Sequence, residues 1–535
     1  MADFNRRTFL HTGVAAVGLA GVPFHILGAD SASSSGPVAN TTSGKIRGRV
    51  VNKVQAFQGI PYGAPTGGNR RYLPAAKPEP WTGIKDTNSW GDEAPQGPHT
   101  EITEVAATIP KTGLSEDCLR LNVWTNSLKG KRPVMVWFHG GGFTSGNGSY
   151  TIYDGANLAR KHDVVQVTVN HRLNTFGFLY LADKGGRFAD ASNVGITDCV
   201  AALQWVKDNI ANFGGDPNNV TIYGQSGGAG KVSTLLAMPS AKGLFHRAII
   251  QSGSNLAGTT VANAVRATET FMAKVNAKTP DDLQKLSMQD LIQATLTTPG
   301  VGGGPVVDGK TLPNGPFDPT APEMSNDVPV IIGTTEYEVT FFPNTKYDPL
   351  DDAQLKAAFA QQTGGNADNA DKLLASYKKG RPKASNLELS LVLASDNFRG
   401  NVITEAERKA AQKAPVYMYY FTWQSPVSGG KLRSFHTLEI PFVNYNVDDG
   451  KSMTGSGQDR YALQDKMSTA WTNFARTGNP NHKGLPQWTP FEMSKRATMI
   501  FDNTCQVVND PHGEERLAYA QYRGAAGRGG GRGRG

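Results

Sequence analysis

The pentapeptide Gly224-Gln225-Ser226-Gly227-Gly228 is the strongest candidate for chemistry in this sequence. A short β-type run, 219–223, precedes it, and a helical stretch, 229–238, follows it. Between a strand and a helix, the pattern G-x-S-x-G forms a nucleophile elbow, a tight turn that exposes a serine hydroxyl at the top of a sheet. We therefore predict that Ser226 is a nucleophile, and that a Cβ at Gly224 or Gly228 would collide where strand and helix nearly touch.

A serine nucleophile also needs donors that stabilise the oxyanion formed when it attacks a carbonyl group. The segment His139-Gly140-Gly141-Gly142 follows directly on the apolar run 133–138. Consecutive glycines let the backbone turn its N–H groups towards one point, as in the HGGG element that accompanies elbow serines. We expect the N–H groups of Gly141, Gly142 and Gly227 to form the oxyanion hole.

The serine further needs a base, which in elbow hydrolases lies late in the chain, after the acid. Four histidines follow the elbow. His246 lies close to the serine in sequence and leads into a strand, while His482 and His512 lie in polar segments. His436 lies in a loop that leads into the apolar run 438–442. The position of His436 fits a loop histidine that reaches the serine.

The acid should lie between the serine and the base, just after a strand. Glu336 and Glu338 both follow the apolar run that ends at Ile332. On spacing alone either carboxylate could orient the base and stabilise its charged form.

The elements that would position these residues alternate between apolar strands and helices. Helix candidates include 197–213 and 261–276, and the stretch 280–400 is richer in polar helix formers. Such alternation predicts an α/β fold with a mostly parallel sheet covered by helices on both faces. We expect the 280–400 helices to be insertions that form a cap at the carboxyl edge of the sheet. The strand candidates are 133–138, 164–169, 220–223, 248–250, 328–332 and 416–421.

The length and the net charge of the chain limit the number of domains and the kind of partner that we expect. No Pro/Ser-rich linker interrupts the body of this 535-residue sequence, so we expect a single catalytic domain over 36–522. The net charge is +8, and part of it lies in the Gly/Arg tail, 523–535, which we expect to be disordered. The remaining charge is too small to indicate a nucleic-acid partner.

The N-terminus, 1–35, has the features of an export signal and linker. Arg6-Arg7 is followed by Phe9 and Leu10 and then by a weakly apolar run, 13–27. This pattern predicts a twin-arginine signal, so the mature protein would be periplasmic or secreted. The run is too short to span a membrane stably, and we expect no membrane insertion after the signal is removed.

The cysteine pattern argues against a metal site. Cys118, Cys199 and Cys505 show neither C-x-x-C nor Cys/His spacing. Three cysteines cannot all pair within one chain, so we expect free, buried thiols. The proposed chemistry requires no metal and no organic cofactor.

Several collinear segments resemble one family, the type-B carboxylesterases, which include the cholinesterases and have the α/β-hydrolase fold. The similar segments are Gln58-Gly59-Ile60-Pro61-Tyr62, then 115–123 (SEDCLRLNV), 212–217 (NFGGDP) and 251–254 (QSGS). The resemblance covers nearly the whole chain after the N-terminal segment.

The resemblance implies specific roles. Counted from Gly333, the family's acid falls on Glu338, although Tyr337 and Val339 depart from the usual neighbours and Glu336 stays an alternative. The pattern His-x-x-Glu-Ile-Pro-Phe places the base at His436.

Two further features follow from the resemblance. Ser252 would be a buried hydroxyl near the acid. Family members often carry a disulfide from the cysteine equivalent to Cys118, but here Ala94 occupies the position of the expected partner.

Gln225 is a departure, because the family commonly has glutamate before the serine. Glutamine removes a negative charge beside the nucleophile. We hypothesise that the site accepts esters that bear free carboxylates and does not favour choline-like cations. The rival interpretation is a neutral packing variant.

Together the residues and the resemblance imply a serine carboxylic-ester hydrolase that acts on a small-molecule ester through an acyl-enzyme. The same triad could act on carbamates, amides or thioesters. A non-catalytic, cholinesterase-like binding module is a further alternative, opposed by the presence of every catalytic part. The sequence predicts neither the natural substrate nor the oligomeric state.

Overall fold

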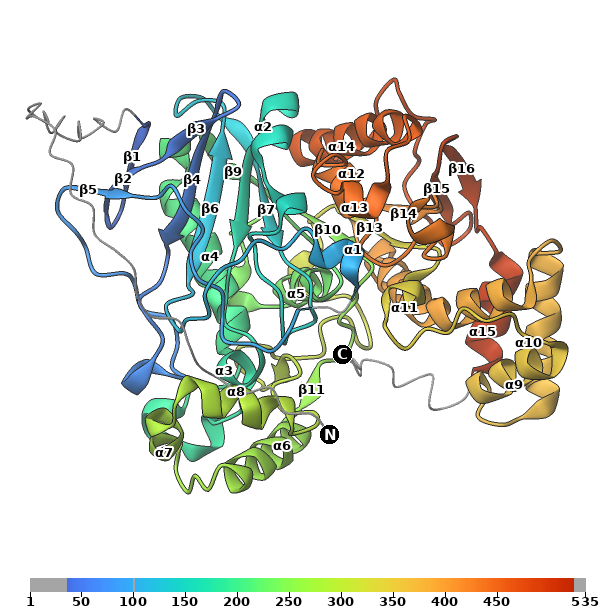
Figure 1. The fold of residues 1–535 in the computed structure, drawn as a ribbon, viewed down its shortest axis with the longest axis horizontal. Coiled ribbons are helices and arrows are strands. Elements are labelled where there is room, and N and C mark those ends of the chain that lie inside the picture. The colour runs from blue at the N-terminus through green and yellow to red at the C-terminus, as the bar shows by residue number, and fades with distance from the viewer. Residues whose placement is uncertain (1–35, 100–101, 524–535) are drawn as a thin grey trace, which may run out of the picture. The chain divides into compact units, whose positions relative to one another are not determined.

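The computed structural model describes residues 36–99 and 102–523 (Figure 1). From Pro37 onward the described residues form one compact unit. The signal and linker predicted for 1–35, and the tail beyond Arg523, lie outside the described residues. Within the described part of the chain, no helix is long and apolar enough to cross a membrane.

An eleven-stranded sheet runs through this unit in the order β16-β15-β14-β13-β10-β9-β7-β8-β6-β4-β3 (Figure 1). The strands from β8 to β15 in this order are parallel, and antiparallel strands flank them at both edges. All six predicted strands lie in the parallel part. The bounds are β3 Arg49–Val51, β4 Val54–Pro61, β6 Arg120–Thr125, β7 Arg132–Phe138, β8 Val165–Val169, β9 Gly215–Gln225, β10 Arg247–Gln251, β13 Val330–Thr335, β14 Val416–Phe421, β15 Ala497–Phe501 and β16 Gln506–Asn509.

Two smaller sheets lie outside this one. One has three strands, in the order β1-β2-β5, and the other pairs β11 with β12. Their bounds are β1 Val38–Thr41, β2 Gly44–Arg47, β5 Ile84–Asp86, β11 Thr259–Thr260 and β12 Val306–Val307.

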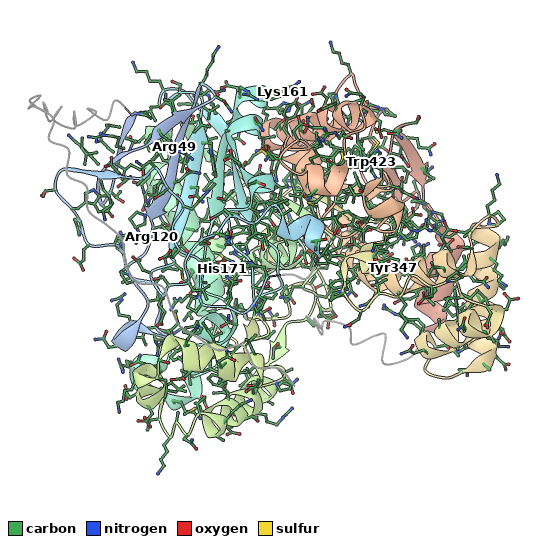
Figure 2. All side chains as sticks on the ribbon, in the orientation of Figure 1. Arg49, Arg120, Lys161, His171, Tyr347 and Trp423 are labelled. Carbon is green, nitrogen blue, oxygen red and sulfur yellow. The ribbon has the colours of Figure 1, made fainter. Side chains whose placement is uncertain are left out.

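Alternate side chains of the parallel strands enter two different cores, as expected for a sheet that is buried on both faces. In β7, Val134 and Val136 belong to one apolar cluster, while Met135 and Trp137 belong to the other. Figure 2 shows side chains filling the space between sheet and helices. The first cluster includes residues of α4 Val194–Asn209, α5 Gly227–Leu235 and α11 Asn386–Ala410, and the second includes residues of α2 Ala156–His162, α12 Ile440–Val443 and α14 Asp459–Thr477.

The helical region 280–400 is not one continuous cap. β13 of the central sheet divides it, and the end of α11 packs on that sheet through Val402 and Ala406. One group, α7 Pro280–Lys285 and α8 Met288–Leu296, shares a core with α3 Asn174–Phe178 and with α6 Val261–Lys274, which precedes this region. The other shares a core with α15 Gly513–Tyr522 and comprises α9 Asp352–Gln362 and α10 Ala367–Gly380. Two short helices, α1 Thr103–Ala106 and α13 Lys451–Thr454, complete the set.

Local sequence explains where three of these helices begin. α7, α9 and α11 each start with a capping box, in which a side chain before the helix and one in its first turn satisfy each other's backbone N–H groups. The pairs are Thr279 with Asp282, Asp351 with Gln354, and Ser385 with Glu388.

Candidate active site

Ser226 lies at the sharp turn between β9 and α5. Its backbone has φ 58° and ψ −125°, a conformation that a non-glycine residue rarely adopts, and its N–H donates to Gln251 O at 2.8 Å. The side chain is half-buried at the carboxyl end of the parallel strands. A strained turn of this kind, held in place by its neighbours, is the geometry of a nucleophile elbow.

The flanking glycines are required by contacts with the neighbouring strand. A Cβ on Gly224 would lie 2.5 Å from Phe138 O, and a Cβ on Gly228 would lie 2.0 Å from the same oxygen. The obstructing atom is backbone at the end of β7, which has little freedom to move. The predicted collision at both positions is confirmed.

The carboxylate of Glu338 contacts the imidazole of His436. Glu338 lies in the 3₁₀ turn Glu338–Phe341 after β13, and its Oε2 is hydrogen-bonded to His436 Nδ1. Oε1 of the same carboxylate accepts the N–H of Thr335 at 2.9 Å. A backbone bridge between Tyr337 and Phe435 joins the two loops one residue before each side chain. The side chains of Glu338 and His436 are both buried.

Glu336 lies elsewhere. Its carboxylate forms an ion pair with Arg381 at 2.6 Å, and Arg381 in turn contacts buried Glu515. The two candidate acids are therefore separated by geometry, and Glu338 is the one in contact with the imidazole.

Three aromatic rings and one side-chain amide lie close to the imidazole of His436. The rings of Phe341, Phe342 and Phe398 lie 5.1–5.8 Å from the imidazole centroid, and all three are half-exposed. Gln225 Nε2 lies 3.3 Å from Nδ1 and 3.2 Å from Nε2 of the imidazole, so the amide nitrogen is nearly equidistant from the two ring nitrogens.

No hydrogen bond joins Ser226 Oγ to His436 within the described residues. In enzymes without substrate such catalytic hydrogen bonds are often long and tighten when the substrate binds. Ser226, Glu338 and His436 all follow parallel strands, namely β9, β13 and β14, which places them at the same edge of the sheet.

The glycine loop after β7 lies against the elbow. A Cβ on Gly140 would lie 3.4 Å from Ser226 Cβ, and one on Gly227 would lie 2.0 Å from Gly142 O. Gly141 and Gly142 have φ of +86° and +62°, which glycine adopts without strain. Among the described residues, no protein acceptor takes the N–H of either glycine. Gly227 is the first residue of α5, where an N–H has no partner within the helix.

Ser252 is fully buried and has a positive φ of 53°. Its N–H donates to Gly333 O at 2.8 Å, which ties it to the strand that precedes Glu338. Its hydroxyl has no hydrogen-bond partner among the residues that the structure describes. Ser252 therefore lies beside the acid's strand without contacting the acid through its hydroxyl.

The three cysteines, Cys118, Cys199 and Cys505, are free and buried, and burial raises the pKa of each thiol. Among the described residues, no group of three or more His, Cys, Asp or Glu side chains is placed to hold a metal ion.

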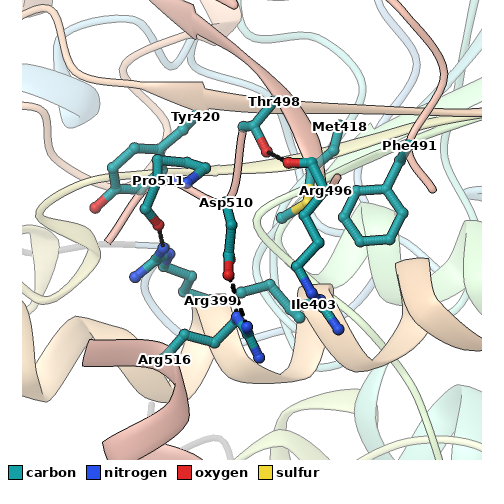
Figure 3. A pocket seen from close by; sticks show the side chains of 10 residues that line it. All are labelled: Arg399, Ile403, Met418, Tyr420, Phe491, Arg496, Thr498, Asp510, Pro511 and Arg516. Carbon is teal, nitrogen blue, oxygen red and sulfur yellow. Dashed lines mark hydrogen bonds and ion pairs between the residues drawn. The ribbon is translucent and has the colours of Figure 1, made fainter. Parts of the chain in front are cut away.

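A small cavity lined by residues of α11, β14, β15 and α15 is distinct from this site (Figure 3). Three arginines line it, and each has partners in the protein: Arg399 with Asp396, Arg496 with Glu407, and Arg516 with Asp510. Ser226, Glu338 and His436 are not among the lining residues. Its charges are therefore already neutralised by neighbouring carboxylates.

Two features of the site could not be placed from sequence. Lys231, on α5 behind the elbow, is fully buried and contacts the glycine loop. In the sequence, the only indication of this residue is that a single lysine interrupts a helix of small and apolar residues. Phe398 comes from α11 and has no sequence signal, because a phenylalanine in a long helix is most often a core residue.

A mostly parallel sheet with helices on both faces and an elbow serine at its carboxyl edge defines an α/β-hydrolase. The model of the carboxylesterase family matches residues 35–520. The chain belongs to this family, and it is an enzyme of the carboxylesterase class.

Relatives and solved structures agree with this assignment. The chain is 34% identical to the para-nitrobenzyl esterase of Bacillus subtilis over 491 residues, which cover 90% of this chain and 97% of the relative. It is 33% identical to the phenmedipham hydrolase of Pseudarthrobacter oxydans, with 89% and 97% covered. The crystal structure of a Geobacillus stearothermophilus carboxylesterase superposes with a TM-score of 0.78 at 37% identity, covering 90% of this chain and 99% of that chain.

Proposed function

We propose that this enzyme hydrolyses small carboxylic esters through an acyl-enzyme on Ser226, with His436 as base and Glu338 as the acid that orients it. The observation that carries the proposal is the buried hydrogen bond between Glu338 and His436 Nδ1. A carboxylate on Nδ1 fixes the tautomer in which Nε2 is free to accept a proton.

The reaction would proceed in two halves. Ser226 Oγ attacks the ester carbonyl carbon as His436 Nε2 takes its proton, and the carbonyl oxygen becomes an oxyanion held by Gly141, Gly142 and Gly227 N–H groups. The oxyanion collapses, the bond to the alcohol breaks, and His436 returns the proton to the departing oxygen. Water then attacks the acyl-enzyme by the same route and releases the acid and free Ser226.

The surroundings of the base support a substrate with an aromatic or bulky apolar group. Phe341, Phe342 and Phe398 place three half-exposed rings around His436. Such rings bind apolar groups through burial and favour aromatic partners at offset or edge-to-face geometry. We propose aryl and other apolar esters as the preferred model substrates.

The neutral amide of Gln225 bears on charge preference. It lies within 3.3 Å of both nitrogens of His436, where a carboxylate would repel an anionic substrate. We propose that the site accepts esters with a free carboxylate. The same catalytic groups would also serve carbamates, amides and thioesters, which a substrate panel separates from esters.

The test is hydrolysis of p-nitrophenyl acetate and p-nitrophenyl butyrate by the purified enzyme and by a folded Ser226→Ala variant. We expect saturable hydrolysis by the wild type and a loss of several orders of magnitude in kcat for the variant. Equal rates for the two proteins would refute Ser226 as the nucleophile.

We also propose that the protein is exported by the twin-arginine route, on the basis of Arg6 and Arg7. In a bacterial host, changing both arginines to lysine should leave the precursor inside the cell. Unchanged export of the double variant would refute this route.

A further inference from the structure

We propose that Lys231 is a positioning residue of the oxyanion hole, and that its ammonium group holds the glycine loop in the conformation that catalysis needs. This inference rests on the proposed function of that loop. Lys231 itself would not touch the substrate.

Lys231 joins the two parts of the site that should supply oxyanion donors. It lies on α5, five residues after Ser226, and its side chain is fully buried. Its Nζ donates to His139 O at 3.0 Å and to Gly142 O at 2.8 Å. Those two carbonyls belong to the first and last residues of the His139–Gly142 loop. The lysine thus tethers both ends of the loop to the elbow helix.

The two tethered peptide groups flank the two donors. The N–H of Gly141 belongs to the peptide that starts at Gly140, and the N–H of Gly142 belongs to the next peptide. The carbonyls held by Lys231 belong to the peptides immediately before and after this pair. Because the intervening residues are glycines with wide conformational freedom, fixing the flanking peptides restricts the rotation of both donors.

The tether complements a contact within the loop. Gly141 O, in the peptide that carries the Gly142 N–H, accepts the N–H groups of Thr144 at 3.3 Å and Ser145 at 3.0 Å, whereas Lys231 holds the peptides on either side. Gly141 and Gly142 are exposed and both have positive φ. Electrostatic stabilisation of an oxyanion depends on donors that are already oriented before the reaction. Loss of the tether should therefore lower the rate of the chemical step strongly, while substrate binding should change little.

Lys231 is the cation of a buried cluster behind the loop. Among the described residues, its ammonium contacts two carbonyl oxygens and no carboxylate. It lies 5.3 Å from the ring centroid of Phe143, and His139 and His171 stack on each other at 4.8 Å. His171 is labelled in Figure 2.

The charges around Lys231 are few. Burial lowers its pKa from 10.5 to about 7, and nearby Cys199 on α4 acts in the opposite direction. Burial also holds the pKa values of His139 and His171 well below their ordinary range, and the charge of Lys231 adds to this effect. Both imidazoles are thus neutral near pH 7, where Lys231 is partly protonated. The charged and the neutral forms of the lysine both carry N–H groups that can donate to the two carbonyls.

Lys409 provides a matched control. It too is buried, its pKa is lowered by burial to about 8, and its Nζ donates to a backbone carbonyl, that of Ser325, at 3.0 Å. It lies on α11 and its partner belongs to the turn Glu323–Ser325, neither of which contains a residue of the proposed triad. A purely structural role for a buried lysine should give the same phenotype at both positions.

The experiment compares Lys231→Met, Lys231→Gln and Lys409→Met with the wild type and Ser226→Ala. It measures kcat and KM for p-nitrophenyl acetate, the inhibition constant of an aryl trifluoromethyl ketone, and the melting temperature. The ketone adds to the nucleophilic serine as a tetrahedral oxyanion, so its affinity reports the oxyanion hole directly.

We expect Lys231→Met to lower kcat by about 10- to 100-fold while KM changes by less than about threefold, since removing a whole donor costs about 10²–10³. The ketone should lose affinity by about the same factor as kcat/KM. Lys231→Gln keeps N–H donors and should retain more kcat than the methionine variant. Lys409→Met should keep kcat within about twofold whatever its melting temperature.

The inference is overturned if the Lys231 variants keep kcat within twofold, if their loss lies only in KM, or if the ketone binds them as tightly as the wild type. If Lys231→Met does not fold, Lys231→Gln alone decides by the same kcat and ketone criteria. Activity retained by Ser226→Ala would instead refute the proposed function. Loss of activity in Ser226→Ala with full activity in the Lys231 variants would refute this inference alone.

Discussion

His436 and Glu338, separated by 98 positions in the chain, share a buried hydrogen bond between Nδ1 and Oε2. The bond is supported from both sides. Thr335 N–H donates to the other oxygen of the carboxylate, and the backbone bridge between Tyr337 and Phe435 holds the two loops together. The imidazole is therefore oriented by fixed backbone, with Nε2 directed away from the acid.

Glu338 and Glu336 form a pair that tests the assignment of the acid. Glu338→Gln would replace the carboxylate on His436 Nδ1 with an amide that can also favour the wrong tautomer. We expect kcat for p-nitrophenyl butyrate to fall by about 10³–10⁴, the scale seen when a triad acid is neutralised. Glu336→Gln breaks an ion pair with Arg381 and should lower the melting temperature with little change in kcat. The opposite pattern would assign the acid to Glu336.

Gly228 and Gly230 test the geometry of the elbow. A Cβ on Gly228 would lie 2.0 Å from Phe138 O, whereas one on Gly230 would lie 3.4 Å from Phe143 Cζ. We expect Gly228→Ala to lose about 3 kcal/mol or more of stability, because backbone of the central sheet would have to move. Gly230→Ala should be neutral or gain up to about 1 kcal/mol from helix propensity. Urea denaturation measures both, and similar stability for the two variants would contradict the elbow contacts.

Gln225→Glu tests the proposed charge preference. A carboxylate at this position would lie beside both nitrogens of His436 and would repel a substrate anion. We expect kcat/KM to fall several-fold more for an aryl ester with a free carboxylate than for a neutral ester of the same size. Equal changes for the two esters would support the rival interpretation, in which Gln225 is a packing residue.

A feature of this site could be predicted from the sequence when residues close to it in the chain determine it, and not when distant residues do. The parallel strands were predictable because continuous Val- and Ile-rich runs are typical of strands buried on both faces, and Ser226 was predictable because its turn chemistry is local. The choice between Glu336 and Glu338 needed the resemblance or the structure. It depends on Arg381, whose ion pair with Glu336 closes only when distant helices pack.

The lysine and the aromatic wall were beyond sequence reasoning for a related reason. Lys231 is five residues from the nucleophile, yet its partners, His139 and Gly142, lie about ninety positions away. Phe398 reaches His436 from the middle of a long helix that also supplies core residues such as Leu389 and Val402. Periodicity assigns such residues to a helix but does not say what lies opposite them.

Glu439 predicts a pH dependence of stability. Burial and then the nearby charge of Glu338 raise the pKa of Glu439 from 4.5 to about 8. Between these values the folded state binds one more proton than the unfolded state, so this group's contribution to stability is present at low pH and is lost as pH rises towards 8. Neutral Glu439→Gln should therefore gain stability relative to the wild type by about 1.4 kcal/mol per pH unit at most over this window.

Parallel denaturant titrations of wild type and Glu439→Gln at pH 5, 6, 7 and 8 measure this difference. Comparing the two proteins cancels other buried groups with opposite effects, such as Lys231 and Lys409, whose lowered pKa values make the folded state bind fewer protons. A difference that does not change with pH would contradict the buried, protonated state of Glu439.

Stoichiometric labelling with a fluorophosphonate, followed by peptide mass spectrometry, tests the serine acyl-enzyme most directly. We predict one adduct per chain on the peptide that contains Ser226, loss of ester hydrolysis in proportion to labelling, and no adduct in Ser226→Ala. An adduct on another residue, or full hydrolysis by the labelled enzyme, would contradict a serine acyl-enzyme at the β9–α5 turn.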